Sequence, residues 1–368
     1  MARKEGFRSA LIFGGAGFIG TNWAARLLET TEAKVHIFDN LSRQGSRHNL
    51  AYLQKVAGRS GRLQITIGDV RDRDMVARSV RLATEIYNFA AQVAVTTSID
   101  DPRLDFEVNA GGTFNILDSV RASGNRPFIL FTSTNKVYGD FGGATAHIEG
   151  RRYVSAASAG TSETQPLDFH SPYGCSKGAA DQYVHDYGRI FNLPTAVFRM
   201  SCIAGQRQFG NEDQGWVAHF LYSAFLGSPL TIYGTGHQVR DVLYVQDLLD
   251  AFELVRAKSD ITRGQIYNVG GGTKNTISLL ELLDLIEQLT GKRPEYRLEA
   301  TRPGDQAIYV TDHAKLSRHT GWSPKTSVPE ILDRIQSFFR ANRTLFAQPK
   351  VEEIGRGAAV IADLPRTA

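Results

Sequence analysis

Two residues four positions apart have the types and spacing of an acid–base pair. Tyr173 and Lys177 lie in Ser171-Pro-Tyr-Gly-Cys-Ser-Lys177, in a stretch whose pattern predicts a helix. Residues at (i, i+4) share one face of a helix. A nearby ammonium group favours the phenolate, so a tyrosine with an ordinary pKa of about 10 can act as a base near neutral pH. In an isolated Y-x-x-x-K pair, a surface Tyr beside a solvated Lys would be the commoner explanation.

A hydroxyl cluster lies upstream, at the end of the apolar run 128–131. It consists of Thr132, Ser133 and Thr134. The carboxyl ends of parallel strands are where sites form in open α/β sheets. We expect the Thr134 hydroxyl to bond the substrate oxygen that loses its proton. The alternative is a routine strand threonine, and the roles of Thr132 and Ser133 are not separable by sequence.

A glycine-rich turn follows the first apolar run of the chain. Gly14, Gly17 and Gly20 come directly after Ala10–Phe13 and open a predicted helix. Glycines let the backbone turn tightly and approach a pyrophosphate that sits on the helix N-terminus. This context predicts a dinucleotide site. Together with the hydroxyl cluster and the Tyr–Lys pair, it predicts a nicotinamide enzyme that oxidises and reduces a sugar alcohol.

The acidic residue Asp39 ends the second predicted strand, at the distance expected for a ribose contact. Its carboxylate can accept hydrogen bonds from both adenosine ribose hydroxyls and would repel a 2′-phosphate, which favours NAD over NADP. Arg43 argues the other way, because an arginine there could receive a phosphate. Asp69 ends the third strand, where a helix N-cap is the alternative role. Further cofactor contacts are predicted at Phe18, Ile19, Asn40, Val70, Ala90, Ala91, Gln92, Asn109 and Thr132.

Short apolar runs alternate with helical patterns such as Phe18–Glu29 and Phe106–Ala122. This alternation predicts βαβ units and a Rossmann-type, doubly wound parallel sheet of the α/β class. We expect the NAD-binding domain over 1–200 and about 241–270. A smaller mixed α/β lobe for the substrate is expected over 201–240 and 271–345, and a flexible tail over 346–368. The Gly- and Ser-rich stretch 141–165 is typical of an active-site loop. The expected strands are Ala10–Phe13, Val35–Asp39, Gln64–Gly68, Glu85–Ala90, Phe128–Ser133, Ala196–Arg199 and Ile266–Val269.

The bulk composition fits a globular enzyme. The chain has 368 residues, 42% hydrophobic and 22% charged, with a net charge of +4. Its Lys and Arg residues are scattered, so we expect no nucleic-acid partner. Cys175 and Cys202 form no C-x-x-C motif, which indicates a reducing, cytoplasmic location and no metal site. We also expect no membrane span, because no apolar run reaches the required length.

At these motifs the sequence resembles the extended short-chain dehydrogenase/reductases and, within them, the nucleotide-sugar epimerases. The resemblance covers about residues 1–345. It rests on the glycine turn, on Thr134 with Tyr173-x-x-x-Lys177, on Arg240-Asp-Val-Leu-Tyr-Val-Gln-Asp247 and on Arg302-Pro-Gly-Asp305. Three further stretches are similar to the 2-epimerases of CDP-hexoses: 133–139, 167–183 and 207–216.

The resemblance implies roles residue by residue. Tyr173 would be the base and then the acid, Thr134 would orient the reacting hydroxyl, and Lys177 would bind the nicotinamide ribose and lower the pKa of Tyr173. Arg240 and Arg302 would clamp the nucleotide diphosphate, a task suited to planar, always charged guanidinium groups. A surface ion pair of Arg240 with Asp241 or Asp247 is the alternative. The implied substrate contacts are Thr134, Asn135, Lys136, Arg207, Gln208, Gln214, Arg240, Arg302 and Asp305.

One difference from related branches bears on the reaction. Sugar 4,6-dehydratases carry an acidic pair just after the threonine, whereas this chain has Asn135-Lys136. Elimination would therefore lack its acid and base, and epimerisation by oxidation and re-reduction needs neither. We expect an NAD-dependent 2-epimerase of a nucleotide-diphosphate sugar, with a CDP-hexose favoured, acting as a homodimer or homotetramer. The alternatives are a UDP-hexose 4-epimerase and a non-catalytic dinucleotide-binding protein.

Overall fold

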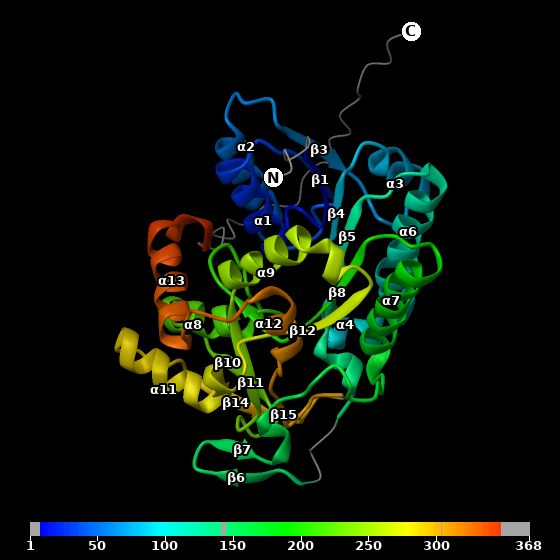
Figure 1. The fold of residues 1–368 in the computed structure, drawn as a ribbon. Helices are drawn as coiled ribbons and strands as arrows, with labels where there is room; N and C mark the ends of the chain where they lie inside the picture. The colour runs from blue at the N-terminus through cyan, green and yellow to red at the C-terminus, as the bar shows by residue number, and fades with distance from the viewer. Residues whose placement is uncertain (1–7, 141–144, 303, 347–368) are drawn as a thin grey trace.

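A parallel seven-stranded sheet forms the centre of the protein, seen in a computed structural model that describes residues 8–140, 145–302 and 304–346 (Figure 1). The strand order is β12-β8-β5-β4-β1-β2-β3, and every neighbouring pair is parallel. This confirms the predicted fold class. The strands are β1 (Ser9–Phe13), β2 (Lys34–Asp39), β3 (Leu63–Ile67), β4 (Glu85–Asn88), β5 (Phe128–Thr134), β8 (Thr195–Met200) and β12 (Gln265–Val269).

These are the seven segments expected from sequence, with ends shifted by one or two residues. The apolar character of the inner strands follows from burial on both faces, and every residue of β5 is buried, whereas the edge strand β3 is partly exposed. The chain order reverses between β1 and β4. In open α/β sheets a ligand crevice forms at such a reversal, at the carboxyl ends of the strands.

Helices cover both faces of the sheet (Figure 1). On one face lie α1 (Phe18–Thr30), α2 (Ser46–Ala57), α9 (Val245–Ala257) and α12 (Ala314–Thr320). On the other lie α3 (Arg73–Val80), α6 (Gly112–Ser123) and α7 (Ser171–Ile190). The expected helix 106–122 is interrupted. The short helices α4 (Val95–Asp100) and α5 (Pro102–Phe106) precede a π-helical turn, η1 (Glu107–Gly111), which leads into α6.

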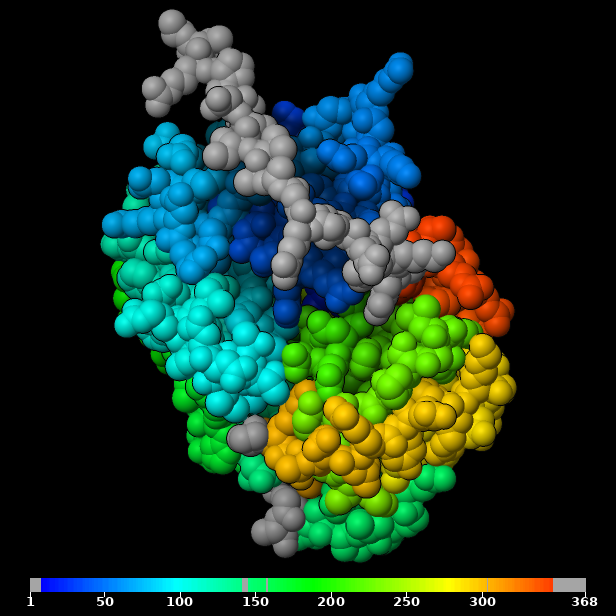
Figure 2. All heavy atoms as spheres, turned by 180° about the vertical axis from the view of Figure 1, so that it is seen from behind, coloured from blue at the N-terminus to red at the C-terminus, as the bar shows by residue number. Residues whose placement is uncertain are grey.

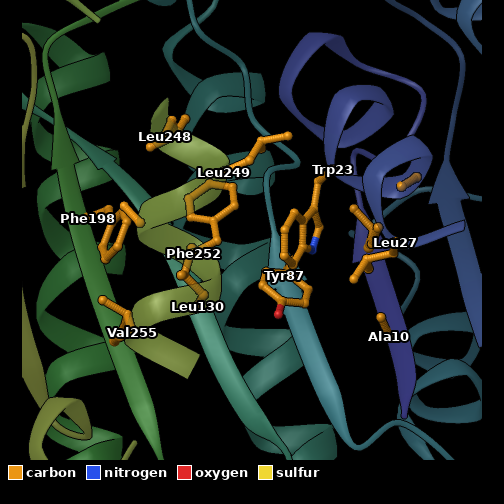
Figure 3. Close-up of a cluster of buried hydrophobic side chains, with 14 of the residues drawn as sticks. Ala10, Trp23, Leu27, Tyr87, Leu130, Phe198, Leu248, Leu249, Phe252 and Val255 are labelled. Carbon is orange, nitrogen blue, oxygen red and sulfur yellow. The ribbon is translucent and has the colours of Figure 1, made fainter. Parts of the chain in front are cut away.

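Aromatic rings join α1 and α9 to the sheet (Figure 3). Trp23 of α1 packs edge-on against Tyr87 of β4 and Phe252 of α9, with ring centroids 5.0 and 5.6 Å apart. All three side chains are fully buried. Truncation of an aromatic ring at such a position typically costs about 3–5 kcal/mol. The cluster therefore fixes α9 on the large sheet, although α9 comes later in the chain than the first segments of the smaller lobe.

A smaller lobe has its own hydrophobic core. Figure 2 shows its green, yellow and orange residues beside the blue and cyan residues of the large-sheet lobe. A four-stranded sheet contains β9 (Cys202–Ala204), β11 (Val239–Tyr244), β13 (Thr276–Ser278) and β15 (Ile308–Tyr309). A two-stranded sheet pairs β10 (Leu230–Tyr233) with β14 (Tyr296–Glu299). The helices are α8 (Trp216–Leu226), α11 (Leu279–Thr290) and α13 (Val328–Ala341).

The lobes divide the chain differently from the expected boundaries. Strand β11 pairs with β9, β13 and β15, so the return to the large sheet begins at α9 and not at residue 241. Conversely, Leu316 and Trp322 pack into the core of the large sheet, although they lie within the expected 271–345 piece. Phe346, expected in the tail, packs on Phe209, Tyr222 and Phe339. The rest of the tail, 347–368, lies outside the described residues.

The described part of the 141–165 stretch contacts both lobes, because Asn268 of β12 donates hydrogen bonds to Thr161 and Glu163 while a preceding hairpin lies on the smaller lobe. Residues 145–165 contain a hairpin of β6 (His147–Glu149) and β7 (Arg152–Val154). Arg152 forms a two-pronged ion pair with Glu281 of α11, with both distances 2.7 Å. The expected active-site role is therefore not supported for this hairpin, and 141–144 lie outside the described residues. Among the described residues, no helix is long and apolar enough to cross a membrane.

Candidate active site

The glycine turn after β1 fits closely against β4. Gly14 adopts a left-handed conformation (φ +72°), and a Cβ atom there would lie 2.7 Å from the Ala90 backbone nitrogen. A Cβ on Gly20 would lie 2.3 Å from the Gly14 carbonyl oxygen. Gly17 caps the N-terminus of α1, whose first turn contains Phe18 and Ile19. Only glycine fits at Gly14 and Gly20, and the turn leaves the backbone at the helix N-terminus without side chains in the way.

Asp39 is buried at the carboxyl end of β2, beside this turn. Its Oδ2 accepts a hydrogen bond from the Ala16 amide at 3.0 Å, and its Oδ1 accepts from the Leu41 amide at 2.8 Å. Burial raises the pKa of Asp39, and these amide hydrogen bonds oppose that effect. The carboxylate keeps unused lone pairs for further donors. A dinucleotide ribose therefore fits this position.

Asp69 lies on the next strand end, at the same edge of the sheet. It accepts hydrogen bonds from Arg71 and from Asn40 Nδ2, and the Arg71 hydrogen bonds are the main reason that the pKa of Asp69 falls to about 2. The alternative role of helix cap belongs instead to Asp72, which accepts from the Met75 amide. Val70 is buried against Gly112.

The segment after β4 is fixed by one buried amide. Asn109, in the π-helical turn η1, is fully buried. Its Oδ1 accepts from the Gln92 amide and its Nδ2 donates to the Gln92 carbonyl, both at 3.0 Å. Ala90 and Ala91 precede this anchor and are half-buried. The backbone 90–92 is therefore held at the carboxyl edge of the sheet, beside the glycine turn.

Thr134 and Tyr173 meet at this edge. Thr134 is the last residue of β5, and its hydroxyl lies near enough to the phenol of Tyr173 to lower the pKa of that group. The Lys136 amide donates to Thr134 Oγ1 at 3.2 Å, while the Tyr173 amide donates to Ser98 Oγ at 3.2 Å. Ser98 of α4 was not recognised in the sequence, since a lone serine carries no distinguishing pattern. The strand end and the helix start thus hold two hydroxyl groups near each other.

Lys177 extends from the same helix into the protein interior. Its Nζ donates to the Thr132 carbonyl at 2.7 Å and lies 4.2 Å from the Phe131 ring centroid. Burial lowers the pKa of Lys177 to about 7, against the opposing charges of Asp181 and Asp105.

Tyr173 has a different environment from the one inferred from the Y-x-x-x-K spacing. Its side chain is half-buried, and burial around the phenol raises its pKa to about 12. The nearby Thr134 hydroxyl and the charge of Arg43 oppose this rise. Lys177 does not lower it, because its ammonium points to Thr132 instead. The tyrosine therefore needs additional positive charge at the site to act as a base near neutral pH.

A shared carboxylate joins two predicted substrate residues. Asp305 Oδ1 accepts from Arg240 Nη2 at 2.7 Å and from Lys136 Nζ at 3.1 Å. Burial by itself would raise the pKa of Asp305, but the charges of Arg240 and Lys136 hold this pKa below its usual value. Neither alternative partner of Arg240 is used, because Asp241 bonds Ser201 and Asp247 bonds the 325–326 backbone. Asn135 is buried next to Lys136.

Arg302 lies over the ring of Tyr233, with its Cζ atom 3.8 Å from the ring centroid. Its Nη2 donates to Asp213 Oδ1 at 3.1 Å, and its buried Nε has no protein partner among the described residues. Arg43 reaches the same loop from the first lobe and donates to Gln214 Oε1 at 2.7 Å. Tyr233 was missed in the sequence, since it reads as an ordinary strand aromatic.

Two predicted substrate residues lie elsewhere. Arg207 has a positive φ of 66°, and its guanidinium carbon lies 3.1 Å from the ring centroid of Tyr52 on α2. It therefore does not join Lys136 and Arg240. Gln208 is buried and donates to the Ile203 carbonyl, so it supports the loop and does not face a ligand.

The fold and the arrangement of Thr134, Tyr173 and Lys177 beside a glycine turn define an extended short-chain dehydrogenase/reductase. The chain belongs to the GDP-mannose 4,6-dehydratase family, whose sequence pattern matches residues 11–335. This confirms the resemblance drawn from the motifs.

Three similar proteins illustrate the range of this family. The CDP-paratose 2-epimerase of Salmonella typhi is 42% identical over 328 residues, covering 87% of this chain and 96% of the relative. The UDP-glucose 4-epimerase of Thermus thermophilus, solved with NAD, is 32% identical with a TM-score of 0.75, covering 91% of this chain and 99% of that one. A dTDP-glucose 4,6-dehydratase of Streptomyces venezuelae, also solved with NAD, is 28% identical with a TM-score of 0.77, covering 91% and 98%.

Proposed function

We propose that this protein is an NAD-dependent nucleotide-sugar 2-epimerase that acts on a CDP-hexose. The observation that carries the proposal is the placement of Thr134, at the end of β5, near Tyr173, in the first turn of α7, with Asn135-Lys136 following Thr134 in place of two acids. The pair supplies proton transfer at a hydroxyl group. The position of the reacting carbon and the CDP preference are supported by the 42% identity to a CDP-paratose 2-epimerase.

The cofactor site is the glycine turn with Asp39. Gly14 and Gly20 leave room for a pyrophosphate at the N-terminus of α1, and the Asp39 carboxylate accepts from ribose hydroxyls and repels a 2′-phosphate. When bound, NAD supplies the hydride acceptor for the sugar carbon and later the hydride donor. Positive charge near Tyr173, of which Arg43 supplies part, would lower the pKa of its phenol.

Tyr173 then performs the proton transfers. Its phenolate takes the proton from the C2 hydroxyl while Thr134 orients that oxygen, and a 2-keto sugar results. The sugar presents its other face, and Tyr173 returns the proton after reduction. Proton transfer by a positioned group typically contributes about 10²–10⁴-fold in rate. Lys177 binds the nicotinamide ribose.

The substrate diphosphate binds to Arg240 and Arg302 from the smaller lobe. Both guanidinium groups already face carboxylates, Asp305 and Asp213, which hold them in place. Lys136 shares the Asp305 carboxylate with Arg240, so we assign its ammonium group to the substrate as well. We do not assign Arg207 and Gln208 to the substrate, because Arg207 lies on the Tyr52 ring and Gln208 bonds the Ile203 carbonyl.

A product analysis in heavy water tests the proposal. Purified protein is incubated with CDP-, GDP-, UDP- and dTDP-hexoses, one sample carrying deuterium at C2. Inversion at C2 with retention of that deuterium supports hydride return to the same carbon. Solvent deuterium at C2 would indicate deprotonation, inversion at C4 alone would indicate a 4-epimerase, and no turnover of any sugar would indicate a binding protein.

Exposed apolar side chains support a homodimer or homotetramer. Phe106, Phe114, Tyr183 and Ile190 are 60%, 41%, 48% and 67% exposed on α5, α6 and α7. Light scattering that finds a monomer at micromolar concentration would contradict this assembly. The free thiols of Cys175 and Cys202 support a cytoplasmic location.

A further inference from the structure

A fully buried acid lies next to the candidate catalytic helix. Asp105 is the fourth residue of the short helix α5 and has no exposed surface. The sequence builds this helix locally, because Asp101 accepts from the Leu104 amide and Pro102 occupies the first turn. The π-helical turn η1 follows directly, and such turns are frequent at functional sites.

The partners of the Asp105 carboxylate are neutral groups. Ser176 Oγ donates to Asp105 Oδ2 at 2.5 Å, and Asn109 Nδ2 donates to Asp105 Oδ1 at 3.1 Å. Among the described residues, no lysine or arginine forms an ion pair with it. Ser176 stands between Tyr173 and Lys177 in α7, and Asn109 holds the backbone of Gln92. Asp105 thus connects the catalytic helix to the segment after β4.

A buried carboxylate without a counter-charge is costly. Ser176, which donates to this carboxylate, directly precedes Lys177 in α7. The ammonium of Lys177, 3% exposed, is the cation whose charge acts on Asp105. Asp181 also acts on Lys177, but its carboxylate is bound by both prongs of Arg199 at 2.9 Å and is balanced by that guanidinium. Of the two carboxylates that act on Lys177, Asp105 is therefore the one that forms no ion pair with an arginine among the described residues.

We propose that Asp105 is a positioning residue that serves as the buried counter-ion of Lys177 and fixes the Tyr173–Lys177 face of α7 through Ser176 and Asn109. The inference rests on the proposed function of that site. It assigns a role in the reaction to a group that does not touch the substrate.

The charges around the pair determine the sign of the effect. Asp105 raises the pKa of Lys177 and of Tyr173, Asp181 also raises that of Lys177, and Arg43 lowers that of Tyr173. Loss of the Asp105 charge therefore lowers the pKa of both Lys177 and Tyr173. Both limbs of the pH profile should move to lower pH, by about one pH unit for a charge at this range.

The test compares three variants. Asp105→Asn keeps the size of the side chain and loses its charge. Ser176→Ala keeps the charge and loses the hydrogen bond, and Asp100→Asn removes an exposed carboxylate of α4 as a control for net charge. The readouts are the pH profile of epimerisation and the NMR titration of the Lys177 Cε signal in protein with ¹³C-labelled lysine, identified with Lys177→Met.

We expect Asp105→Asn to move the alkaline limb of the pH profile to lower pH and to lower the pH at the midpoint of the Lys177 titration. Asp100→Asn should change neither readout. Ser176→Ala should reduce turnover, and it should shift the Lys177 titration midpoint less than Asp105→Asn does. An unchanged Lys177 titration in Asp105→Asn would overturn the counter-ion role. Absence of epimerase activity in the wild type would refute the proposed function, while the NMR titration would still decide the role of Asp105.

If Asp105→Asn unfolds too readily to be titrated, its stability gives the answer. The ammonium of Lys177 is then left without its counter-charge. The double variant with Lys177→Met should regain much of the lost melting temperature because it removes that charge. A double variant as unstable as the sum of the two single changes would contradict the coupling.

Discussion

Arg302 and Asp213 form an ion pair of 3.1 Å, and the same oxygen of Asp213 accepts a hydrogen bond from Thr96 at 2.8 Å. Thr96 belongs to α4 beside the large sheet, whereas Asp213 and Arg302 belong to the smaller lobe. The carboxylate thus bridges the lobes and holds a guanidinium group that we assign to the substrate diphosphate.

This bridge predicts competition between Asp213 and the substrate. In Asp213→Ala, Arg302 is free to bind the diphosphate, so KM for the nucleotide sugar should fall about threefold, the scale of a partly exposed ion pair. Steady-state kinetics measure the change. Asp260→Ala, on the surface in α10 (Ser259–Thr262), is the charge control and should leave KM unchanged. A higher KM in Asp213→Ala would show that the carboxylate assists binding.

Removal of one hydroxyl group tests the base. Tyr173→Phe should lower kcat at least about 100-fold, because a general acid–base group is lost. The fold should persist, since the ring is kept and the Tyr173 amide still bonds Ser98. Turnover is measured together with thermal melting. Near-normal kcat with an unchanged melting temperature would place the base elsewhere.

The glycine turn offers a matched pair of substitutions. Gly14 and Gly124 have nearly the same left-handed conformation, φ +72° and +73°, but a Cβ on Gly124 meets nothing within 4 Å. Both Ala variants place a side chain at a positive φ, and only Gly14→Ala collides with Ala90. We expect the wild type and Gly124→Ala to retain NAD(H) through purification, and Gly14→Ala to lose it. Chromatography of the supernatant after denaturation measures the nucleotide, and recovery of NADP would contradict the role of Asp39.

Lys177 should make stability depend on pH. Its pKa is about 7 in the folded protein and 10.5 ordinarily, so the unfolded chain binds more protons between these values. The stability contributed by this residue therefore rises with pH across that window, by roughly 1 kcal/mol per pH unit. In nucleotide-free protein, the melting temperature of the wild type minus that of Lys177→Met should increase from pH 7 to pH 9.5. A constant difference would show that Lys177 titrates normally.

The sequence could predict what depends on short stretches of chain. The inner strands of the large sheet are apolar runs between turn residues, because a parallel sheet is buried on both faces away from its edges. The spacing of Tyr173 and Lys177 predicts a shared helix face, and Gly14 predicts a turn that needs a left-handed residue. These features involve neighbours in sequence, so the local pattern contains the physical cause.

Only the tertiary structure decided which distant groups meet. Strand β11 is buried like most strands of the large sheet, and its lobe is determined by pairing with β9, β13 and β15. Arg207 lies in a motif shared with epimerases, yet a positive φ directs its guanidinium onto Tyr52. Asp105 reads as a surface acid of an ordinary helix, and its burial against Ser176 follows from packing across 71 residues of chain. Contacts of this kind depend on the whole packed core, since no local propensity encodes the partner of a side chain.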